Sequence, residues 1–465
     1  MYDLAVIGGG PGGYVAAIRG AQEGLKTILI EKDSFGGTCL NRGCIPTKSF
    51  IYDSKLLEKA QNSEVLTGTG SLAIDGAKLL ARKQKVVARL VGGLGAIIKS
   101  NGIETVQGLG SLEGPGKVRV SKADGSSQLV EARNVLLATG SRPSFPPFID
   151  IDGEHVQTTD EALNSDTIPK DVLIIGGGVI GVEMATIYLN LGAQVTIVEM
   201  LPDILMTEDK DVRDSLLKLL KQRGAKIHLN ASVKAIAREG DTVQSLFADS
   251  EGAEHKVQTE RVLVATGRGP VLDGIDVEKL GLQMEGPYVK INSSCMTNLP
   301  NVYAIGDLVG GMMLAHKASA EAEVAVEHML GQQRTLNPRF IPRCIWGVTE
   351  VGAVGLTEEE AKAAGYSIKV GKFPYANSGA AQAMGDDHGF AKIVGDATTG
   401  EILGVHIVGE HATDLISEAV TTMKMEGAVE DLFQAVKPHP TVSEVVLEAA
   451  LDWSGIAIHA PRRRE

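Results

Sequence analysis

The chain opens with a short apolar run, residues 3–8, that ends in a cluster of glycines. An apolar run of this length, bounded by turn residues, is typical of a buried strand. A helical stretch follows at 14–23, and a second apolar run at 27–30 ends at Glu31. The pattern therefore predicts a strand–helix–strand unit at the start of the chain.

Three glycines after the first run have the spacing G-x-G-x-x-G: Gly8, Gly10 and Gly13. Glycines at this spacing allow a tight turn, a close backbone approach to a pyrophosphate and a phosphate site at a helix N-terminus. Glu31 stands 23 residues after Gly8, where an acidic side chain can accept a hydrogen bond from a ribose hydroxyl. We interpret the unit as a dinucleotide site; the alternative is a glycine-rich turn that binds no ligand.

The same pattern recurs in the middle of the chain. An apolar run leads into Gly176, Gly178 and Gly181, a helix follows, and a second run ends at Glu199, again 23 residues after the first glycine. The repeat predicts two dinucleotide sites. Glu199 would repel a 2′-phosphate and is followed by Met200 rather than by an arginine, so the second site is expected to favour NAD over NADP.

Other segments extend this organisation. A helical region at about 50–100 and a β-rich segment at 108–131 lie between the motifs, and short strands alternate with helices after about residue 337. The predicted fold class is α/β, with two Rossmann-like dinucleotide-binding domains and a C-terminal α+β domain. Three strand-to-glycine turns, each typical of a plain turn when taken alone, are Thr139-Gly140, Thr266-Gly267 and Gly306-Asp307.

Two cysteines, Cys39 and Cys44, lie just downstream of the first motif. In a straight helix, residues five apart lie roughly 8 Å apart at their α-carbons. That distance exceeds the usual disulfide span of about 4.4–6.8 Å, so the pair can close only at a distorted helix start. The residues that favour such a distortion are Gly36, Gly37, Gly43 and Pro46. We interpret the two cysteines as a redox-active pair.

Composition narrows the classes of protein. With 465 residues, 43% hydrophobic and 22% charged, the chain is long enough for two to four globular domains. The net charge of −13 argues against a nucleic-acid partner. No apolar run suits a membrane span and no targeting segment is recognisable, so a cytoplasmic location is expected. The four cysteines do not suit a secreted disulfide framework, and no cluster of Cys and His near the pair suggests a metal site.

A histidine near the C-terminus, His439, stands between two prolines in the run 437–444. Because prolines fix the backbone on either side, the pattern favours a held imidazole over a mobile one. The alternative is a surface histidine in a proline-rich loop.

Together these features resemble the flavin-dependent disulfide reductases, and among them the branch that oxidises dihydrolipoyl groups. The resemblance covers essentially the whole chain, and its most specific segments are 36–48, the two nucleotide motifs, 304–307, 313–318 and 439–444. It implies an FAD-binding domain at 1–145, an NAD-binding domain at 146–270, a central domain at 271–337 and an interface domain at 338–465.

The resemblance also implies roles for individual residues. The positions expected at FAD are Gly8, Gly10, Gly13, Glu31, Thr38, Lys48, Gly110, Thr139, Gly140, Asp307, Met313, Leu314, Ala315 and His316. Those expected at NAD are Gly176, Gly178, Gly181, Glu199 and Gly267. Lys48 and Glu183 are expected to form an ion pair beside the flavin; the alternative is an exposed cation and an exposed acid on two helices.

In proteins of this kind Cys39 would meet the substrate and Cys44 would face the flavin, with a nearby base and a helix N-terminus lowering a thiol pKa. His439, oriented by Glu444, would act as the base in the active site of the other subunit, which implies an obligate homodimer. Electrons would pass from a lipoyl-bearing protein, either of a 2-oxoacid dehydrogenase complex or the glycine-cleavage carrier, through FAD to NAD⁺. The alternatives are a reductase of glutathione or another small disulfide that uses NADPH, and a non-catalytic protein that keeps the fold.

Three positions depart from the common pattern. Lys437 stands where another histidine is frequent, residues 345–350 replace a more usual Tyr-Thr-x-Pro-Glu run, and Gly269 stands where a second arginine is frequent. The first two are expected to affect the substrate channel.

Overall fold

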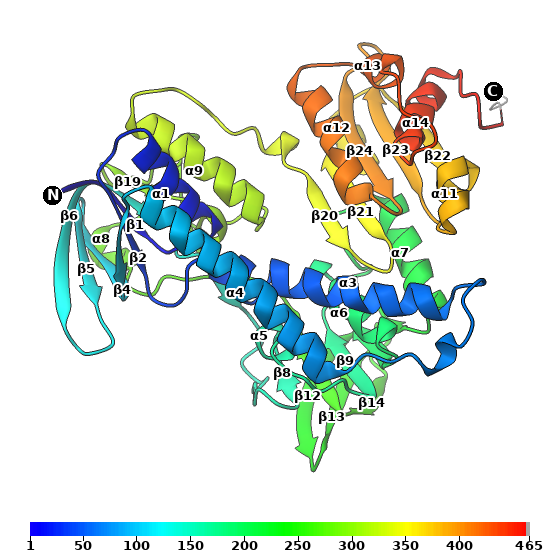
Figure 1. Ribbon diagram of the computed structural model, residues 1–465, viewed down its shortest axis with the longest axis horizontal. Helices are drawn as coiled ribbons and strands as arrows, with labels where there is room; N and C mark the ends of the chain where they lie inside the picture. Colours follow the sequence, from blue (N-terminus) through cyan, green and yellow to red (C-terminus); the bar gives the residue numbers. More distant parts are fainter. Residues whose placement is uncertain (462–465) are drawn as a thin grey trace. The chain divides into compact units, whose positions relative to one another are not determined.

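The computed structural model describes residues 1–461, and its contacts divide the chain into two compact units (Figure 1). The first unit comprises Met1–Ile168 and Thr266–Leu336, and the second comprises Pro169–Ala265 and the chain from Asn337 to the last described residue. Each unit contains one of the two glycine motifs. The predicted α/β class is confirmed, whereas the domain boundaries at 145, 270 and 337 remain predictions.

The first unit is built around a sheet with strand order β3-β2-β1-β6-β5-β4, and β19 also pairs with β6. The central pairs are parallel, and β4 and β5 form an antiparallel ribbon that continues from β6. The strands of the first unit as a whole are β1 (Tyr2–Ile7), β2 (Thr27–Glu31), β3 (Glu104–Gln107), β4 (Leu109–Gly114), β5 (Lys117–Ser121), β6 (Ser127–Leu137), β7 (Ser141–Pro143), β8 (Val156–Gln157), β16 (Arg268–Pro270), β17 (Met284–Glu285), β18 (Tyr288–Val289) and β19 (Val302–Ala304). Its helices are α1 (Pro11–Gln22), α2 (Gly37–Asn41), α3 (Cys44–Gln61), α4 (Gly76–Ser100), α5 (Thr159–Ala162), α8 (Val277–Leu280) and α9 (Ala315–Met329), with 3-10 turns at Thr69–Ser71 and Gly306–Val309.

The apolar run of β1 has no polar alternation because both faces of the sheet are covered. Leu4 and Val6 pack into one core with Ala16 of α1, whereas Ala5 and Ile7 pack into the core on the other face. The run therefore reads as a buried parallel strand, as the sequence predicts.

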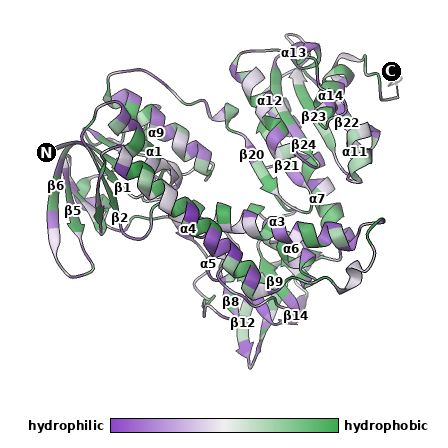
Figure 2. Ribbon diagram, viewed as in Figure 1, coloured by the Kyte–Doolittle hydropathy of each residue, from purple (hydrophilic) through white to green (hydrophobic). Residues whose placement is uncertain are grey.

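The predicted helical region at 50–100 consists of two helices, α3 and α4. Asp75 caps α4 by accepting a hydrogen bond from the backbone N–H of Lys78 at 3.1 Å. Figure 2 shows apolar and polar residues alternating along α4, and the helix buries Leu79, Leu94 and Ile98. Helix α1 begins at Pro11, earlier than the predicted stretch, because proline suits a first helical turn.

The second unit contains a parallel sheet, an antiparallel meander and a C-terminal antiparallel sheet. Their strand orders are β11-β10-β9-β15, β12-β13-β14 and β20-β21-β24-β23-β22. The strands are β9 (Asp171–Ile175), β10 (Gln194–Val198), β11 (Lys226–His228), β12 (Ser232–Glu239), β13 (Thr242–Ala248), β14 (Glu254–Thr259), β15 (Arg261–Val264), β20 (Arg343–Trp346), β21 (Glu350–Gly355), β22 (Ile368–Pro374), β23 (Phe390–Asp396) and β24 (Ile402–Val408). The helices are α6 (Val179–Asn190), α7 (Lys210–Gln222), α10 (Glu358–Ala363), α11 (Gly379–Met384), α12 (Ala412–Lys424), α13 (Val429–Gln434) and α14 (Glu444–Ser454), with 3-10 turns at Pro338–Phe340 and Tyr375–Asn377.

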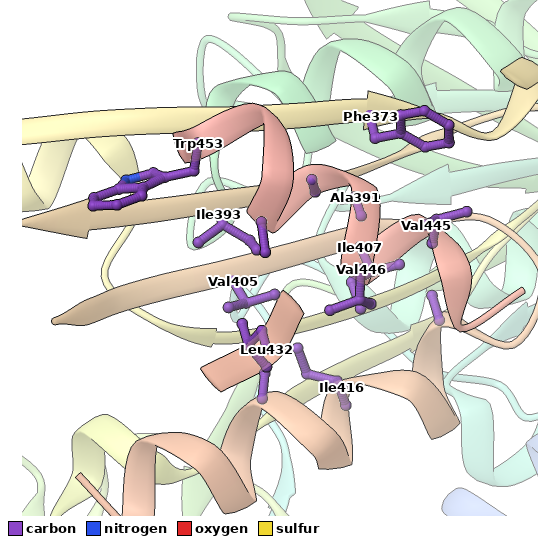
Figure 3. Packing of buried hydrophobic residues seen from close by; sticks show 14 of the residues in the cluster. Phe373, Ala391, Ile393, Val405, Ile407, Ile416, Leu432, Val445, Val446 and Trp453 are labelled. Atoms are coloured by element: carbon purple, nitrogen blue, oxygen red, sulfur yellow. The ribbon is translucent and has the colours of Figure 1, made fainter. Parts of the chain in front are cut away.

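One face of the C-terminal sheet carries an apolar core under α12, α13 and α14. Figure 3 shows Trp453 and Val446 of α14 and Ile416 of α12 packed with the strand residues Ile393 and Val405. This core holds α14, the helix that begins at the predicted orienting residue Glu444.

The opposite face of the same sheet meets α7 through charges. Lys392 alternates with the core residues of β23, so its side chain points to the other face. Its buried Nζ lies 2.8 Å from Asp209 Oδ1, 3.0 Å from Asp211 Oδ2 and 2.8 Å from Glu358 Oε2. Burial opposes the charged form, but hydrogen bonds to these carboxylates outweigh it and raise the pKa of Lys392. The ionic contact joins the C-terminal sheet to the glycine-motif domain within this unit.

Candidate active site

The first glycine motif requires glycine for steric reasons. Gly8 has a φ of +104°, and a Cβ on Gly13 would lie 1.8 Å from the carbonyl oxygen of Gly8. Gly10 is extended and precedes the first turn of α1. The backbone N–H groups at this helix start are therefore open to a close ligand, as the motif predicts.

Glu31 at the end of β2 is held by the motif that it serves. Its Oε2 accepts a hydrogen bond from the N–H of Gly9 at 2.6 Å, and its Oε1 accepts one from the N–H of Asp33 at 2.7 Å. A carboxylate oxygen has two acceptor sites, so these bonds fix the side chain while leaving capacity for a ligand hydroxyl.

A cavity in the first unit brings four of the predicted FAD positions together: Gly8, Glu31, Gly110 and Thr139. Glycine is needed at 110 because a Cβ there would lie 2.9 Å from a methyl carbon of Ile7. The donor and acceptor set suits the nucleotide end of a dinucleotide, so the residues present fit the predicted cofactor.

Val271 and Asp273 are among the residues lining this cavity that sequence reasoning missed. Val271 accepts a hydrogen bond from Thr139 Oγ1 at 2.6 Å, and Asp273 forms ion pairs with Lys32 and Arg142 at 3.1 Å each. No local motif marks Val271 or Asp273, because they come from a segment about 130 residues after Thr139.

The second glycine motif repeats the geometry in the second unit. Gly176 has a φ of +111°, and a Cβ on Gly181 would lie 2.0 Å from the carbonyl oxygen of Gly176. Glu199 accepts hydrogen bonds from the N–H of Gly177 at 2.5 Å and from the N–H of Leu201 at 2.8 Å. Gly267, the remaining position expected at NAD, lies in the first unit, with a φ of +135°.

The two cysteines stand on either side of a break between helices. Cys39 lies in α2 and Cys44 is the first residue of α3, and no disulfide joins them in the structure. The break falls at Arg42 and Gly43, whose φ values are −149° and −127°. A distorted helix start is therefore present at the predicted place, with Pro46 inside the first turn of α3.

The surroundings of the pair raise the pKa of the Cys39 thiol. The largest cause is a hydrogen bond with the Cys44 side chain, followed by burial and the charge of Cys44; Asp307 adds to the rise and Lys48 opposes it. The neighbouring Cys44 side chain and burial therefore disfavour a thiolate at Cys39. The charges of Lys48 and Asp307 both act on the Cys39 thiol, so these two predicted positions lie near it.

Tyr14 on α1 is a further neighbour of the cysteines that sequence reasoning missed. Burial raises the pKa of its phenol, and the charges of Cys39 and Cys44 raise it further. The redox loop also touches the first motif, since a Cβ on Gly37 would lie 2.6 Å from Gly10 Cα. The cysteines therefore stand directly beside the predicted pyrophosphate turn.

The Asp307 turn follows β19 and leads to α9. Asp307 lies in the 3-10 turn Gly306–Val309, and its Oδ2 accepts a hydrogen bond from Ser141 Oγ at 2.5 Å. The predicted positions beyond it form the entry to α9: Met313, Leu314 as its N-cap, and Ala315 and His316 as its first residues. Gly140 precedes Ser141 with a φ of +74°, so a second predicted turn meets the first through this bond.

His439 and Glu444 form the predicted pair at the start of α14. His439 Nδ1 lies 2.9 Å from Glu444 Oε1, and Glu444 Oε2 accepts a hydrogen bond from the N–H of Thr441 at 3.0 Å. Burial raises the pKa of Glu444, but the hydrogen bonds from His439 and Thr441 outweigh it and lower the pKa. The side chain of His439 is 76% exposed, so an oriented imidazole is presented at the surface of this chain.

The structure accounts for two of the sequence departures. The ammonium of Lys437 is buried and paired with Glu418 of α12, so its charge is compensated away from His439. In the run 345–350, the N–H of Trp346 donates to Oε1 of the buried Glu183 at 3.2 Å.

The residues of the catalytic hypothesis divide between the two units. The first unit contains Cys39, Cys44, Lys48 and Asp307, and the second contains Glu183, His439 and Glu444. The Lys48–Glu183 ion pair remains a prediction.

Residues 1–461 contain neither a cluster of metal ligands nor a membrane-spanning helix. No group of three or more His, Cys, Asp or Glu side chains in that part of the chain could hold a metal ion. No helix there is long and apolar enough to cross a membrane.

The chain is similar over most of its length to a known protein family. Residues 2–322 match the family model described as pyridine nucleotide-disulphide oxidoreductase, and residues 341–450 match the dimerisation domain of the same family. A dihydrolipoyl dehydrogenase from Bacillus subtilis is 39% identical over 470 residues, covering 98% of this chain and 99% of the relative. A dihydrolipoyl dehydrogenase from Haloferax volcanii is 38% identical, covering 99% and 98%.

Solved structures of flavoprotein disulfide reductases and related proteins have a similar fold. The crystal structure of LpdA from Mycobacterium tuberculosis is 27% identical, has a TM-score of 0.90 and covers 97% of this chain and 99% of its own. The flavoprotein disulfide reductase RclA from Escherichia coli is 26% identical, has a TM-score of 0.85 and covers 97% and 99%.

Two dinucleotide motifs with a cysteine pair beside one of them define an oxidoreductase. The chain belongs to the pyridine nucleotide-disulphide oxidoreductases, and within them to the dihydrolipoyl dehydrogenases. The family predicted from the motifs is thus confirmed, and FAD and NAD, the predicted cofactors, are those of this family.

Proposed function

We propose that this chain oxidises protein-bound dihydrolipoyl groups through Cys39 and Cys44 and delivers the electrons to NAD⁺. The observation that carries the proposal is the thiol pair at the broken helix start, within electrostatic reach of Lys48 and Asp307 and beside the first nucleotide motif. A dithiol substrate and a two-cysteine acceptor exchange disulfides without a further redox group between them.

The residues of the first unit would hold FAD. The nucleotide end would lie at the cavity formed by Gly8, Glu31, Gly110 and Thr139, and Asp307 would contact the part that extends toward the cysteines. FAD, when bound, accepts the two electrons of the reduced pair and supplies the hydride that reduces NAD⁺.

Thiol exchange would begin with a proton transfer. His439 of the partner subunit takes a proton from one substrate thiol, and the resulting thiolate attacks Sγ of Cys39 in the oxidised pair. Sγ of Cys44 leaves as a thiolate. The second substrate thiol then attacks the substrate sulfur of the mixed disulfide and forms the disulfide of the oxidised lipoyl group, while Sγ of Cys39 leaves and takes up the proton of that second thiol. Hydrogen bonding with Cys44 and burial disfavour a thiolate at Cys39.

A homodimer would supply His439 to this reaction. The imidazole is exposed yet oriented by Glu444, which suits a base that acts on another chain. The match of residues 341–450 to the dimerisation domain supports this assembly. The lipoyl-bearing partner would come in trans, either from a 2-oxoacid dehydrogenase complex or as the glycine-cleavage carrier; a cytoplasmic location remains a prediction.

Glu199 would select NAD over NADP. Its carboxylate is fixed by two backbone N–H groups at the end of β10, where it can accept from a 2′-hydroxyl and repel a 2′-phosphate. Neighbouring Met200 offers no positive charge.

Steady-state turnover tests the proposal. The purified dimer should oxidise free dihydrolipoamide with NAD⁺ at least about tenfold better than with NADP⁺, because the binding loss of a repelled phosphate reaches that size. Cys39→Ser and Cys44→Ser should each abolish turnover, whereas Cys344→Ser, a cysteine of the second unit, should retain it. Preferred reduction of glutathione disulfide by NADPH would replace this function with that of a different disulfide reductase.

A further inference from the structure

A short ribbon in the first unit brings two distant turns together. Strands β7 and β16 pair antiparallel, with Pro270 opposite Ser141 and Arg268 opposite Pro143. The N–H of Val271 also donates to the carbonyl of Gly140 at 3.0 Å. The ribbon thus places the side chain of Arg268 against Ser141, although 127 residues separate them.

The Arg268 guanidinium donates two hydrogen bonds to Ser141. Its Nε donates to Ser141 Oγ at 2.7 Å, and its Nη2 donates to the carbonyl oxygen of Ser141 at 2.8 Å. Such a two-point contact needs the planar fork of a guanidinium, which a lysine ammonium does not reproduce.

Ser141 passes this constraint to Asp307. The arginine N–H occupies an acceptor site on Ser141 Oγ, so the hydroxyl proton is directed toward Asp307 Oδ2, 2.5 Å away. Ser141 is 9% exposed, which limits competition from solvent for the same hydroxyl. The orientation of the Asp307 carboxylate is therefore set by a chain of two side chains.

The backbone of the same turn is held separately. Lys317 and Glu321 on α9 form an ion pair at 2.8 Å, with side chains 10% and 7% exposed. Glu321 accepts a hydrogen bond from the N–H of Gly306 at 2.7 Å, and Lys317 donates to the carbonyl of Gly310 at 3.0 Å. The ion pair fixes both ends of the turn, and the Arg268–Ser141 contact fixes the direction of its side chain.

We propose that Arg268 and Ser141 are positioning residues that aim the carboxylate of Asp307 at bound FAD. The proposal rests on the proposed function, in which Asp307 contacts the flavin. Arg268 acts on FAD only through Ser141 and Asp307, so its contribution to FAD retention disappears when either partner is removed.

Release of FAD from the holoenzyme on dilution, separated by a spin filter, measures this contribution. Arg268→Met and Ser141→Ala should each speed release by about 10- to 100-fold, the range expected for a lost hydrogen bond to a charged group. The double variant should release FAD no faster than Ser141→Ala alone. Arg268→Lys should remain defective although its charge is kept. Arg133→Met, which removes an exposed arginine 3.7 Å from Asp3, is the matched control and should behave as the unaltered protein.

Additive effects in the double variant would overturn the proposal, because Arg268 would then act by another route. Release at the unaltered rate from Arg268→Lys would also overturn it, since charge alone would suffice. If Ser141→Ala does not fold, the same comparison of single and double variants is made with Arg268→Met and Asp307→Asn. Absence of FAD from the unaltered protein would refute the proposed function itself; bound FAD with unaffected variants would refute the positioning role alone.

Discussion

The two glycine motifs share one backbone geometry but differ in what surrounds them. The φ angles of Gly8 and Gly176 are +104° and +111°. The residues before the helices, Gly10 and Gly178, have φ/ψ of −72°/−175° and −73°/−173°. Local sequence therefore determines the pyrophosphate turn in both units.

The two motif glutamates, Glu31 and Glu199, also have matching hydrogen bonds. Glu31 and Glu199 each accept one hydrogen bond from the glycine that follows the first motif glycine, and one from the residue two positions further along the chain. The difference lies on the helices: the position of Glu183 in α6 is occupied by Val15 in α1. The two motifs therefore differ on the helix that follows each turn.

The largest expected effects come from the third glycine of each motif. Gly13→Ala would place a Cβ 1.8 Å from a backbone oxygen, and Gly181→Ala one 2.0 Å away. Each should cost about 3 kcal/mol through forced backbone movement. If the motifs serve different cofactors, Gly13→Ala should lose FAD, whereas Gly181→Ala should keep FAD and lose affinity for NAD⁺. Flavin content and the KM for NAD⁺ measure this, and loss of both cofactors from both variants would break the comparison.

The next effect concerns Glu199. Glu199→Gln removes the charge and keeps the shape, so NAD⁺ affinity should fall by about 10- to 100-fold, the range for a hydrogen bond to a charged group. The preference over NADP⁺ should shrink as well. The matched change Glu31→Gln should weaken FAD retention without altering the KM for NAD⁺. Steady-state kinetics with both nucleotides separates the outcomes, and equal effects of the two changes on NAD⁺ would contradict the assignment.

A smaller effect is expected at Glu444, outside both motifs. Its folded-state pKa lies below the usual 4.5, so the hydrogen bonds to its carboxylate stabilise the protein above pH 4.5. That contribution is lost as the pH falls through the lowered folded-state pKa. The stability difference between the unaltered protein and Glu444→Gln, measured by urea unfolding, should stay below about 1 kcal/mol for so exposed a pair and vanish in acid. A difference that grows toward low pH would contradict the sign.

The smallest effect is expected for Lys437. Its charge is paired with Glu418, so Lys437→Met should change kcat by less than about threefold and leave the pH profile of kcat/KM in place. A displaced profile would mean that the cation acts on His439 after all. FAD and NAD⁺ binding should be unaffected, because neither motif is touched.

Residues fixed by local geometry were predictable, and residues assembled from distant segments were not. Gly13 and Gly181 are required by contacts within their own turns, and the helix break between Cys39 and Cys44 falls where nearby glycines favour it. Val271 reaches the nucleotide cavity only because β7 and β16 pair. The fold class followed from strand–helix alternation.

The electrostatic effects at Cys39 and Lys437 also follow from the three-dimensional structure rather than from the sequence. The sequence indicates that the cysteines can meet at a distorted helix start, whereas the rise of the Cys39 pKa depends on the hydrogen bond with Cys44 and on burial, which only the structure shows. The sequence likewise marks Lys437 as a cation near His439, and only the structure shows its pairing with Glu418. Spacing identifies partners, whereas the sign of an effect depends on every charge that surrounds them.

The central claim is that Cys39 and Cys44 form the acceptor of electrons from a dihydrolipoyl group. Anaerobic titration of the flavin-loaded protein with dihydrolipoamide, combined with thiol counting, tests it most directly. The account predicts two new thiols and a long-wavelength thiolate-to-flavin band, both absent in Cys44→Ser and retained in Cys344→Ser. A flavin-loaded protein that gains no thiols and shows no band, or a Cys44→Ser variant that responds like the unaltered protein, would contradict it.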